Sequence, residues 1–100
     1  MPAAISSSQK RYLRGLAHSL KPVILLGEKG VTPGVLAELD LALSHHELVK
    51  VRIPGEERQV REAVVVELAE QTNAAVVQRI GHVATLYRRN PDAPQIALPR

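Results

Sequence analysis

The sequence predicts a small two-layer α/β domain, with helices packed on a mixed four-stranded sheet. Stretches of helical periodicity alternate with short apolar or alternating runs, in the order helix, strand, helix, strand, helix, strand, strand. The 100 residues, 45% of them hydrophobic, suffice for one core, and we expect a single domain with residues 91–100 as an extended tail. Two strand–helix–strand units predict parallel neighbouring strands, and the last two strands form a hairpin.

The first helix is expected within residues 6–20, with Ser7 or Ser8 as its N-cap. Its apolar side consists of Tyr12, Leu13, Leu16, Ala17 and Leu20. The adjacent arc is cationic, contains no acidic residue, and comprises Lys10, Arg11, Arg14 and His18, with Lys21 extending it. A solvated surface stripe is one interpretation, but the absence of acidic partners favours a surface that binds polyanions.

Residues 22–27 form a short apolar run bounded by proline and glycine, which predicts a strand buried on both faces. A second helix should then begin with Thr32 as its N-cap and Pro33 as its first residue, and continue to about Ser44. Its apolar stripe consists of Val35, Leu36, Leu39, Ala42 and Leu43.

Residues 47–53 alternate strictly between apolar and polar side chains, which predicts a half-exposed strand with Lys50 and Arg52 on its outer face. A third helix follows within residues 56–74, with an apolar stripe through Val60, Ala63, Val64 and Leu68. Two apolar runs around Gly81 and His82 predict a hairpin with a two-residue turn. The last ten residues contain three prolines and should trail over the surface.

Charge is unevenly distributed along the chain, whose net charge is +3. Residues 1–30 carry five Lys or Arg and one acid, residues 31–70 carry four and eight, and residues 71–100 carry four and one. A basic beginning, an acidic middle and a basic end favour a polyanion-binding face. No signal peptide or membrane-spanning stretch is recognisable, so we expect a cytoplasmic protein.

Catalytic and metal-binding signals are weak. The chain has no cysteine, which excludes disulfides, thiolate metal sites and thiol nucleophiles. His45 and His46 are adjacent, so on a helix they point about 100° apart and suit a helix C-terminus better than a shared metal. The serines cluster at the N-terminus without a recognisable base. We therefore expect no enzyme activity, metal or cofactor.

The glycine loop between the first strand and the second helix carries the strongest signal for a ligand. Gly27 and Gly30 flank Glu28 and Lys29, just before the predicted helix start at Thr32. Such a loop is often only a turn, but unpaired amides at a helix start, beside a lysine, also form a cradle for phosphate. The longer pattern of a nucleotide-binding loop is missing, so a nucleic-acid backbone is the better ligand, as in KH domains.

The stretches LKPVILLGEKGVTPGVLAELDLALSHHELVKVRI, IGHVATLYRR and IALPR resemble the YhbY family, bacterial stand-alone members of the chloroplast RNA splicing and ribosome maturation (CRM) domain. The resemblance covers essentially the whole chain. It implies an αβαβαββ fold like the C-terminal domain of bacterial initiation factor three, RNA binding, and association with precursors of the large (50S) ribosomal subunit. It also implies that Gly27, Glu28, Lys29 and Gly30 form the RNA-contacting loop. Many members have a neutral or basic residue in place of Glu28, whose carboxylate is expected to point away or to contact a base donor.

The predicted function is therefore RNA binding during ribosome assembly, by a monomer that contacts structured ribosomal RNA. With two tyrosines as its only Phe, Trp or Tyr residues, the chain is poorly suited to stacking many bases. The expected RNA-binding residues are Lys10, Arg11, Arg14, Lys21, Gly27, Glu28, Lys29, Gly30 and Thr32, with Lys50 and Arg52 as further candidates. The alternative is a protein-interaction module that docks on ribosomal proteins or assembly factors through its acidic middle. On charge alone, DNA also remains open as the ligand.

Overall fold

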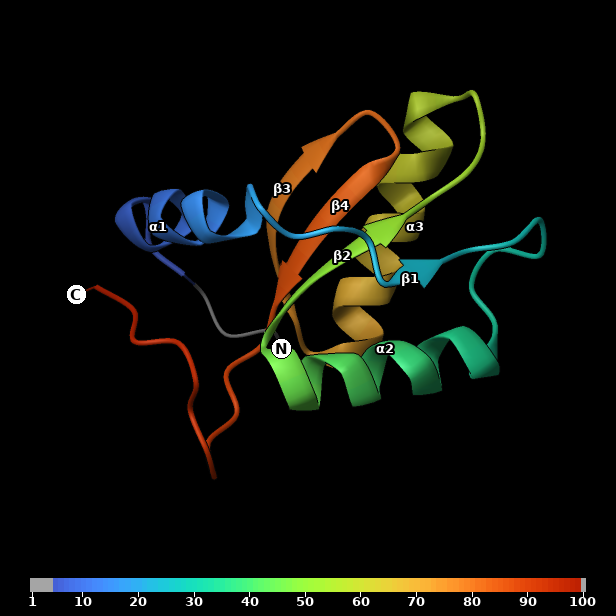
Figure 1. Ribbon diagram of the computed structural model, residues 1–100. Helices are drawn as coiled ribbons and strands as arrows, with labels where there is room; N and C mark the ends of the chain where they lie inside the picture. The colour runs from blue at the N-terminus through green and yellow to red at the C-terminus, as the bar shows by residue number, and fades with distance from the viewer. Residues whose placement is uncertain (1–4, 100) are drawn as a thin grey trace.

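The computed structural model describes residues 5–99, so residues 1–4 and Arg100, which the single-domain prediction includes, lie outside the described residues. Three helices and a mixed four-stranded sheet follow one another in the predicted order (Figure 1). The elements are α1 (Ser7–Ala17), β1 (Ile24–Leu25), α2 (Pro33–His46), β2 (Leu48–Arg52), α3 (Arg58–Thr72), β3 (Ala75–Ile80) and β4 (Val83–Tyr87). None of these helices has the length and apolar character needed to cross a lipid bilayer.

The strands lie in the order β1-β2-β4-β3. β1 and β2 are parallel neighbours, as predicted, whereas β4 pairs antiparallel with both β2 and β3. The expectation that β2 and β3 are neighbours is therefore wrong, although the two strands run in the same direction. β4, the second strand of the hairpin, lies between β2 and β3. The connection through α3 therefore passes over the position of β4 before it enters β3.

The helices α2 and α3 cover one face of the sheet and enclose the main hydrophobic core. β2 contributes Val49 and Val51 to this core, and Ile53 directly after the strand joins them, which confirms the predicted alternation. The remaining buried members are Ile24, Leu26, Leu39, Leu43, Val65, Leu68, Ala69, Ala74, Ala84 and Leu86. In α3 the buried side is shifted from the predicted one, since Val60 is exposed and Val65 is buried. The tertiary contacts with the sheet decide this, because the run of three valines offers more than one apolar stripe.

Helix α1 packs on the opposite face of the sheet, where it adds a partial third layer to the predicted arrangement (Figure 1). Its second, smaller core consists of Leu13, Ala17, Leu48, Val77 and Tyr87. Only two of the five apolar residues expected on this side of the helix are buried, because the helix ends at Ala17 and rests on only part of the sheet. The rest of this sheet face stays open.

Strand β1 differs most from its prediction. It is only two residues long and lies at the edge of the sheet, with Leu25 65% exposed and Val23 beside it 59% exposed. The predicted burial on both faces is wrong, because α1 does not extend over this edge. A continuous apolar run fits a strand that is buried on both faces and also a strand that is buried on one face and exposed on the other. The sequence alone does not distinguish these two arrangements.

The N-cap of α2 agrees with the prediction from the sequence, whereas that of α1 does not. Thr32 caps α2 as predicted, and its hydroxyl accepts a hydrogen bond from the amide of Val35 at 3.1 Å. The N-cap of α1 is Ser6 and not Ser7 or Ser8, because Ser6 has Gln9 three residues later. The amide of each residue bonds to the side chain of the other, at 3.0 and 3.2 Å, which forms a capping box.

Up to residue 99, the tail after β4 contains no helix or strand, and a buried carboxylate is the centre of the hydrogen bonds that hold it in place. Glu47 ends α2 with a φ of 62° and is 0% exposed. Its carboxylate accepts hydrogen bonds from the amides of Asn90 at 2.7 Å and of Gln95 and Ile96 at 2.8 Å each. Ile96 and Leu98 then pack against the smaller core under α1. The tail is thus anchored to the fold and does not simply trail over the surface.

The charge of Glu47 also affects its surroundings. Burial alone would raise the pKa of Glu47, but the three backbone donors and the nearby Arg89 outweigh it, so its pKa is lowered. Burial, and then the negative charge of Glu47, raise the pKa of Tyr87. The hydroxyl of Tyr87 is buried and has no hydrogen-bond partner among the described residues.

Candidate nucleic-acid interface

The glycine loop forms a tight turn that projects from one end of the molecule (Figure 1). The amide of Gly30 donates a hydrogen bond to the carbonyl of Gly27 at 3.0 Å, and Gly30 has a φ of 68° that side chains rarely adopt. Gly30 is therefore required by the fold. Gly27 has an ordinary φ, and a Cβ at that position would meet open space. The fold therefore does not require glycine at position 27. Because Gly27 is exposed and has no side chain, its backbone is accessible to a ligand.

The phosphate cradle expected at this turn is smaller than predicted. The Gly30 amide is used within the turn, and the amides of Val35 and Leu36 in the first turn of α2 bond to the hydroxyl and the carbonyl of Thr32, at 3.1 and 3.0 Å. The Thr32 hydroxyl is likewise used for capping. Within the described chain, the amides of Glu28 and Lys29 at the exposed tip donate no hydrogen bond. The tip of the turn thus offers free donors beside a lysine, and at the start of α2 the amide of Gly34 also has no hydrogen-bond acceptor among the described residues.

Lys50 and Arg52 lie on the open face of the sheet, as predicted from the alternation of β2. The ammonium group of Lys50 donates to the carbonyl of Leu20 at 3.1 Å, so it is partly engaged in holding the segment between α1 and β1. Arg52 is exposed and pairs in register with Leu25, and its carbonyl accepts a hydrogen bond from the amide of Leu26 at 3.0 Å. Arg52 therefore lies where the glycine turn begins.

The cations of α1 lie at the other end of the same face. Lys10, Arg11 and Arg14 are exposed, and none of them forms an ion pair within the described residues. The helix rests on Leu48, at the opposite end of β2 from Arg52. Four residues of strand correspond to about 13 Å. Figure 1 accordingly shows α1 and the glycine turn at opposite ends of the molecule.

The α1 cations therefore do not flank the glycine turn, because α1 packs away from the β1 edge. The structure instead distributes the predicted residues over three places: α1 at one end, the turn at the other, and Lys50 with Arg52 between them. Lys21 lies in the segment that connects α1 to β1 and is exposed. Together these positions form one elongated cationic face, suited to contacts with several phosphates of a folded polyanion.

Sequence reasoning missed the apolar part of this face. The exposed side chains of Val23 and Leu25 lie beside Arg52 at the β1 edge and could contact ribose or base surfaces. The apolar sequence of residues 22–27 does not by itself indicate that Val23 and Leu25 are exposed. Conversely, Arg88 is neutralised, since its guanidinium contacts the Asp40 carboxylate at 2.6 Å and the Ser44 hydroxyl at 2.9 Å. Arg88 thus ties the chain after β4 to α2 and does not add to the cationic face.

The histidines form no catalytic or metal-binding constellation in the part of the chain that the structure describes. His45 and His46 occupy the last turn of α2, as expected. The Nδ1 atom of His82 lies 3.1 Å from the carbonyl of Ile53 and helps to hold the hairpin turn. Among residues 5–99, no group of three or more His, Cys, Asp or Glu side chains is arranged to hold a metal ion.

These features define a small α+β domain with a glycine turn and a cationic, partly open sheet face. The chain belongs to the CRS1 / YhbY (CRM) domain family, whose sequence pattern matches residues 5–88. The solved structure of SAV1595 from Staphylococcus aureus has the same fold, with a TM-score of 0.84 and 31% identity over 96% of this chain and all of that one.

Similar proteins of other organisms bear names that refer to RNA. The chain is 48% identical to a protein of Haemophilus influenzae named "RNA-binding protein", over 96% of both chains. It is 46% identical to "Probable RNA-binding protein PA4753" of Pseudomonas aeruginosa, over 88% of this chain and 85% of that one. It is 32% identical to "Probable RNA-binding protein YqeI" of Bacillus subtilis, over 95% of this chain and 99% of that one.

Proposed function

We propose that this protein binds structured RNA through the elongated cationic face, and that its ligand is ribosomal RNA in precursors of the large (50S) ribosomal subunit. The observation that carries the proposal is the cationic face itself, where Lys10, Arg11 and Arg14 on α1 lack ionic partners within the described residues. Relatives of nearly the same length, named for RNA binding, support RNA as the polyanion.

We further propose that the protein acts in the cytoplasm, as a monomer, and that it catalyses no reaction. Recognition depends on phosphates, ribose hydroxyls and RNA shape, because Tyr12 is 43% exposed and Tyr87 is buried, which leaves one accessible ring among Phe, Tyr and Trp. If about five cations contact phosphates, the logarithm of the association constant falls with the logarithm of salt concentration with a slope of about −3.5 to −4.5.

The direct test is crosslinking in cells, followed by sequencing of the attached RNA and by sedimentation of the protein with ribosomal particles. We expect ribosomal RNA to be enriched and the protein to sediment with immature large subunits. Enrichment of other transcripts without particle association would contradict the ribosomal assignment. Competition between a hairpin RNA and a DNA duplex of equal charge separates RNA from DNA as the ligand.

A protein-docking function is the second candidate, because exposed acids gather on the opposite side of the sheet. They include Glu38 on α2 and Glu67 and Glu70 on α3, whereas Asp40 on α2 is already paired with Arg88. This surface would suit basic ribosomal proteins or assembly factors. Association with ribosomal particles that survives nuclease treatment, and that is lost on neutralising these acids, would favour docking over RNA binding.

A further inference from the structure

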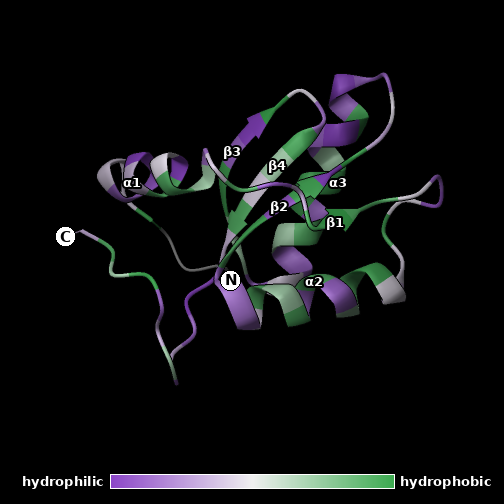
Figure 2. Ribbon diagram, in the orientation of Figure 1, coloured by the Kyte–Doolittle hydropathy of each residue, from purple (hydrophilic) through white to green (hydrophobic). Residues whose placement is uncertain are grey.

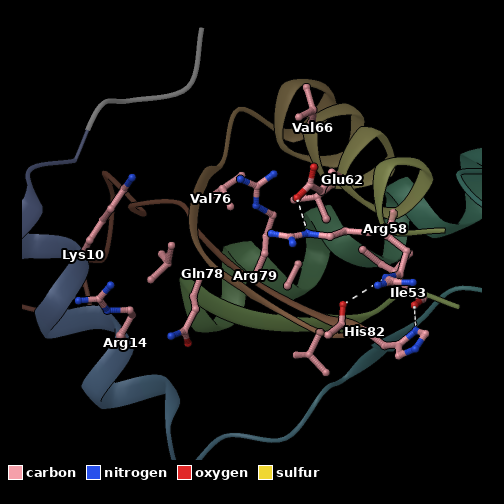
Figure 3. A pocket seen from close by; sticks show the side chains of 16 residues that line it. Lys10, Arg14, Ile53, Arg58, Glu62, Val66, Val76, Gln78, Arg79 and His82 are labelled. Atoms are coloured by element: carbon pink, nitrogen blue, oxygen red, sulfur yellow. Dashed lines mark hydrogen bonds and ion pairs between the residues drawn. The ribbon is translucent and has the colours of Figure 1, made fainter. Parts of the chain in front are cut away.

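A basic cleft lies along the outer edge of β3, away from the glycine turn. It has a volume of about 740 Å³ and is bordered by α1 on one side and by α3 on the other (Figure 3). Five cationic side chains line it, against one carboxylate, that of Glu62. The five are Lys10, Arg14, Arg58, Arg61 and Arg79. Only Lys10 and Arg14 belong to the residues already proposed to bind RNA.

The cations of the cleft keep most of their charge unneutralised. Arg61 is fixed by neutral acceptors, since its guanidinium donates to the carbonyls of Gly55 at 2.6 Å and Gly81 at 3.2 Å. Arg79 is exposed and has no ion pair or hydrogen bond from its side chain within the described residues. Of the five, Arg58 alone has an ionic partner among residues 5–99, namely Glu62 at 3.2 Å on the solvent-exposed side of α3. An exposed pair of this kind is weak and is readily exchanged for a phosphate contact.

The backbone beside these cations is also available. β3 is the edge strand of the described sheet, so one side of its main chain has no sheet partner. Figure 2 shows a hydrophilic stretch near the arrowhead of β3, close to the equally hydrophilic first turns of α3. In Figure 3, Lys10 and Arg14 come from α1 while Arg79 and Arg58 lie over β3 and towards α3. A polyanion in this cleft would meet cations from both faces of the sheet.

The same edge is poorly suited to an added peptide strand. The pairing of β3 with β4 shifts register between Val76 and Gln78, which is a β-bulge. Bulges and charged side chains are features by which edge strands avoid pairing with other chains. The cleft therefore fits a phosphodiester backbone, which needs cations and scattered donors, better than it fits a peptide, which needs a regular ladder.

We propose that the β3-edge cleft is a second RNA-backbone site, which binds a phosphodiester segment at a distance from the one at the glycine turn. The inference rests on the proposed function and adds Arg58, Arg61 and Arg79 to the binding residues. A folded RNA would then contact the protein both at the turn and at the β3 edge. This requires a ligand with two backbone segments held apart, as in a hairpin or a helical junction.

The test measures binding of a hairpin RNA at several salt concentrations. Replacing Arg79 by glutamine (Arg79→Gln) should weaken binding roughly 5- to 8-fold at about 0.1 M salt and reduce the salt slope by about 0.7 to 0.9. Arg79→Lys, which keeps the charge, should retain the slope. Glu62→Gln should tighten binding, whereas Glu67→Gln, an equal charge change on α3 outside the cleft, should have little effect. Thermal unfolding of each variant checks that the fold is intact.

The outcomes separate the two proposals. If Arg79→Gln and Glu62→Gln bind like the original protein while Lys29→Ala binds more weakly, the cleft is not an RNA site and the proposed function stands. A cleft occupied by an acidic peptide would give this same unchanged RNA affinity and would equally overturn the inference. If the unaltered protein itself fails to bind hairpin RNA, the proposed function fails first.

Discussion

Helices α1 and α2 lie against opposite faces of one sheet and differ in charge and in the way they are held. α1 carries Lys10, Arg11 and Arg14 and no acidic residue, whereas α2 carries Glu38 and Asp40 and no lysine or arginine. The sheet thus separates the cationic helix α1 from the acidic helix α2. A net charge of only +3 conceals this separation, which would orient the protein towards a polyanion.

The two helices also depend on cores of different size. The core between the sheet and the α2–α3 layer contains thirteen buried residues, and the core under α1 contains five. Since burial of apolar surface is the main source of stability, the α2–α3 side determines whether the protein folds. The α1 side presents the cations and is held by fewer contacts. The main core and the proposed RNA-binding cations of α1 therefore lie on different faces of the sheet.

The largest expected effect comes from the main core. Leu39→Ala should destabilise the whole protein by about 2–5 kcal/mol, because Leu39 is fully buried between α2 and the sheet. Leu13→Ala, in the core under α1, should mainly increase hydrogen exchange of α1 amides while α2 and α3 keep their protection. Denaturant unfolding and amide exchange measure the two. Equal loss of protection in all three helices of the Leu13 variant would contradict the proposed division.

The charge difference between the helices predicts the next largest effect. Replacing Lys10, Arg11 and Arg14 together by glutamine should weaken binding of a hairpin RNA about 100- to 500-fold at about 0.1 M salt. The salt slope should decrease by about 2.1 to 2.7. Glu38→Gln on α2 is the matched control and should leave the slope unchanged. Similar slopes for the triple variant and the original protein would remove α1 from the interface.

The attachment of α1 through the tail gives the third prediction. Glu47→Gln should cost about 1–3 kcal/mol, because three backbone amides lose a charged acceptor. Since the pKa of Glu47 is lowered by folding, its contribution is present above its unfolded pKa and disappears as pH falls through the folded pKa. Unfolding measured from neutral to acidic pH should show this loss. The loss of stability at acidic pH should persist in the Asp92→Asn variant, which removes an exposed carboxylate of the tail. The loss should be much smaller in the Glu47→Gln variant.

The smallest effect is expected at the glycine turn. Lys29→Ala removes one cation from the end of the cationic face and should weaken RNA binding roughly 5- to 8-fold at about 0.1 M salt. Lys29→Arg preserves the charge and should bind normally. Filter binding or fluorescence anisotropy over a salt series makes the comparison. A Lys29→Ala variant with unaltered slope would confine the interface to α1 and the sheet.

The sequence predicted the features that depend on neighbouring residues. The order of elements, the Thr32 cap, the alternation of β2 and the turn at Gly81 and His82 were all found as expected. Each depends on a local pattern of a few residues. The exposure of Leu25 and the placement of α1 on the far face could not be read in this way, because both depend on which elements meet in three dimensions.

Glu47 illustrates the limit for individual side chains. Its hydrogen-bond partners lie 43, 48 and 49 residues further along the chain, so no periodicity marks it. A glutamate between a helix and a strand is usually exposed, whereas this one is buried and ordered by backbone donors. The β3-edge cleft could not be predicted from the sequence for the same reason, since its cations come from three separate elements, α1, α3 and β3.

The carboxylate of Glu47 has a practical consequence for defining the folding unit. The family pattern ends at residue 88, but the three amides that neutralise this buried acid belong to residues 90–96. A fragment cut at the end of the pattern would leave an uncompensated charge inside the protein and uncover the apolar underside of its first helix. The segment beyond the pattern is part of the architecture, and truncation there should yield an aggregation-prone product.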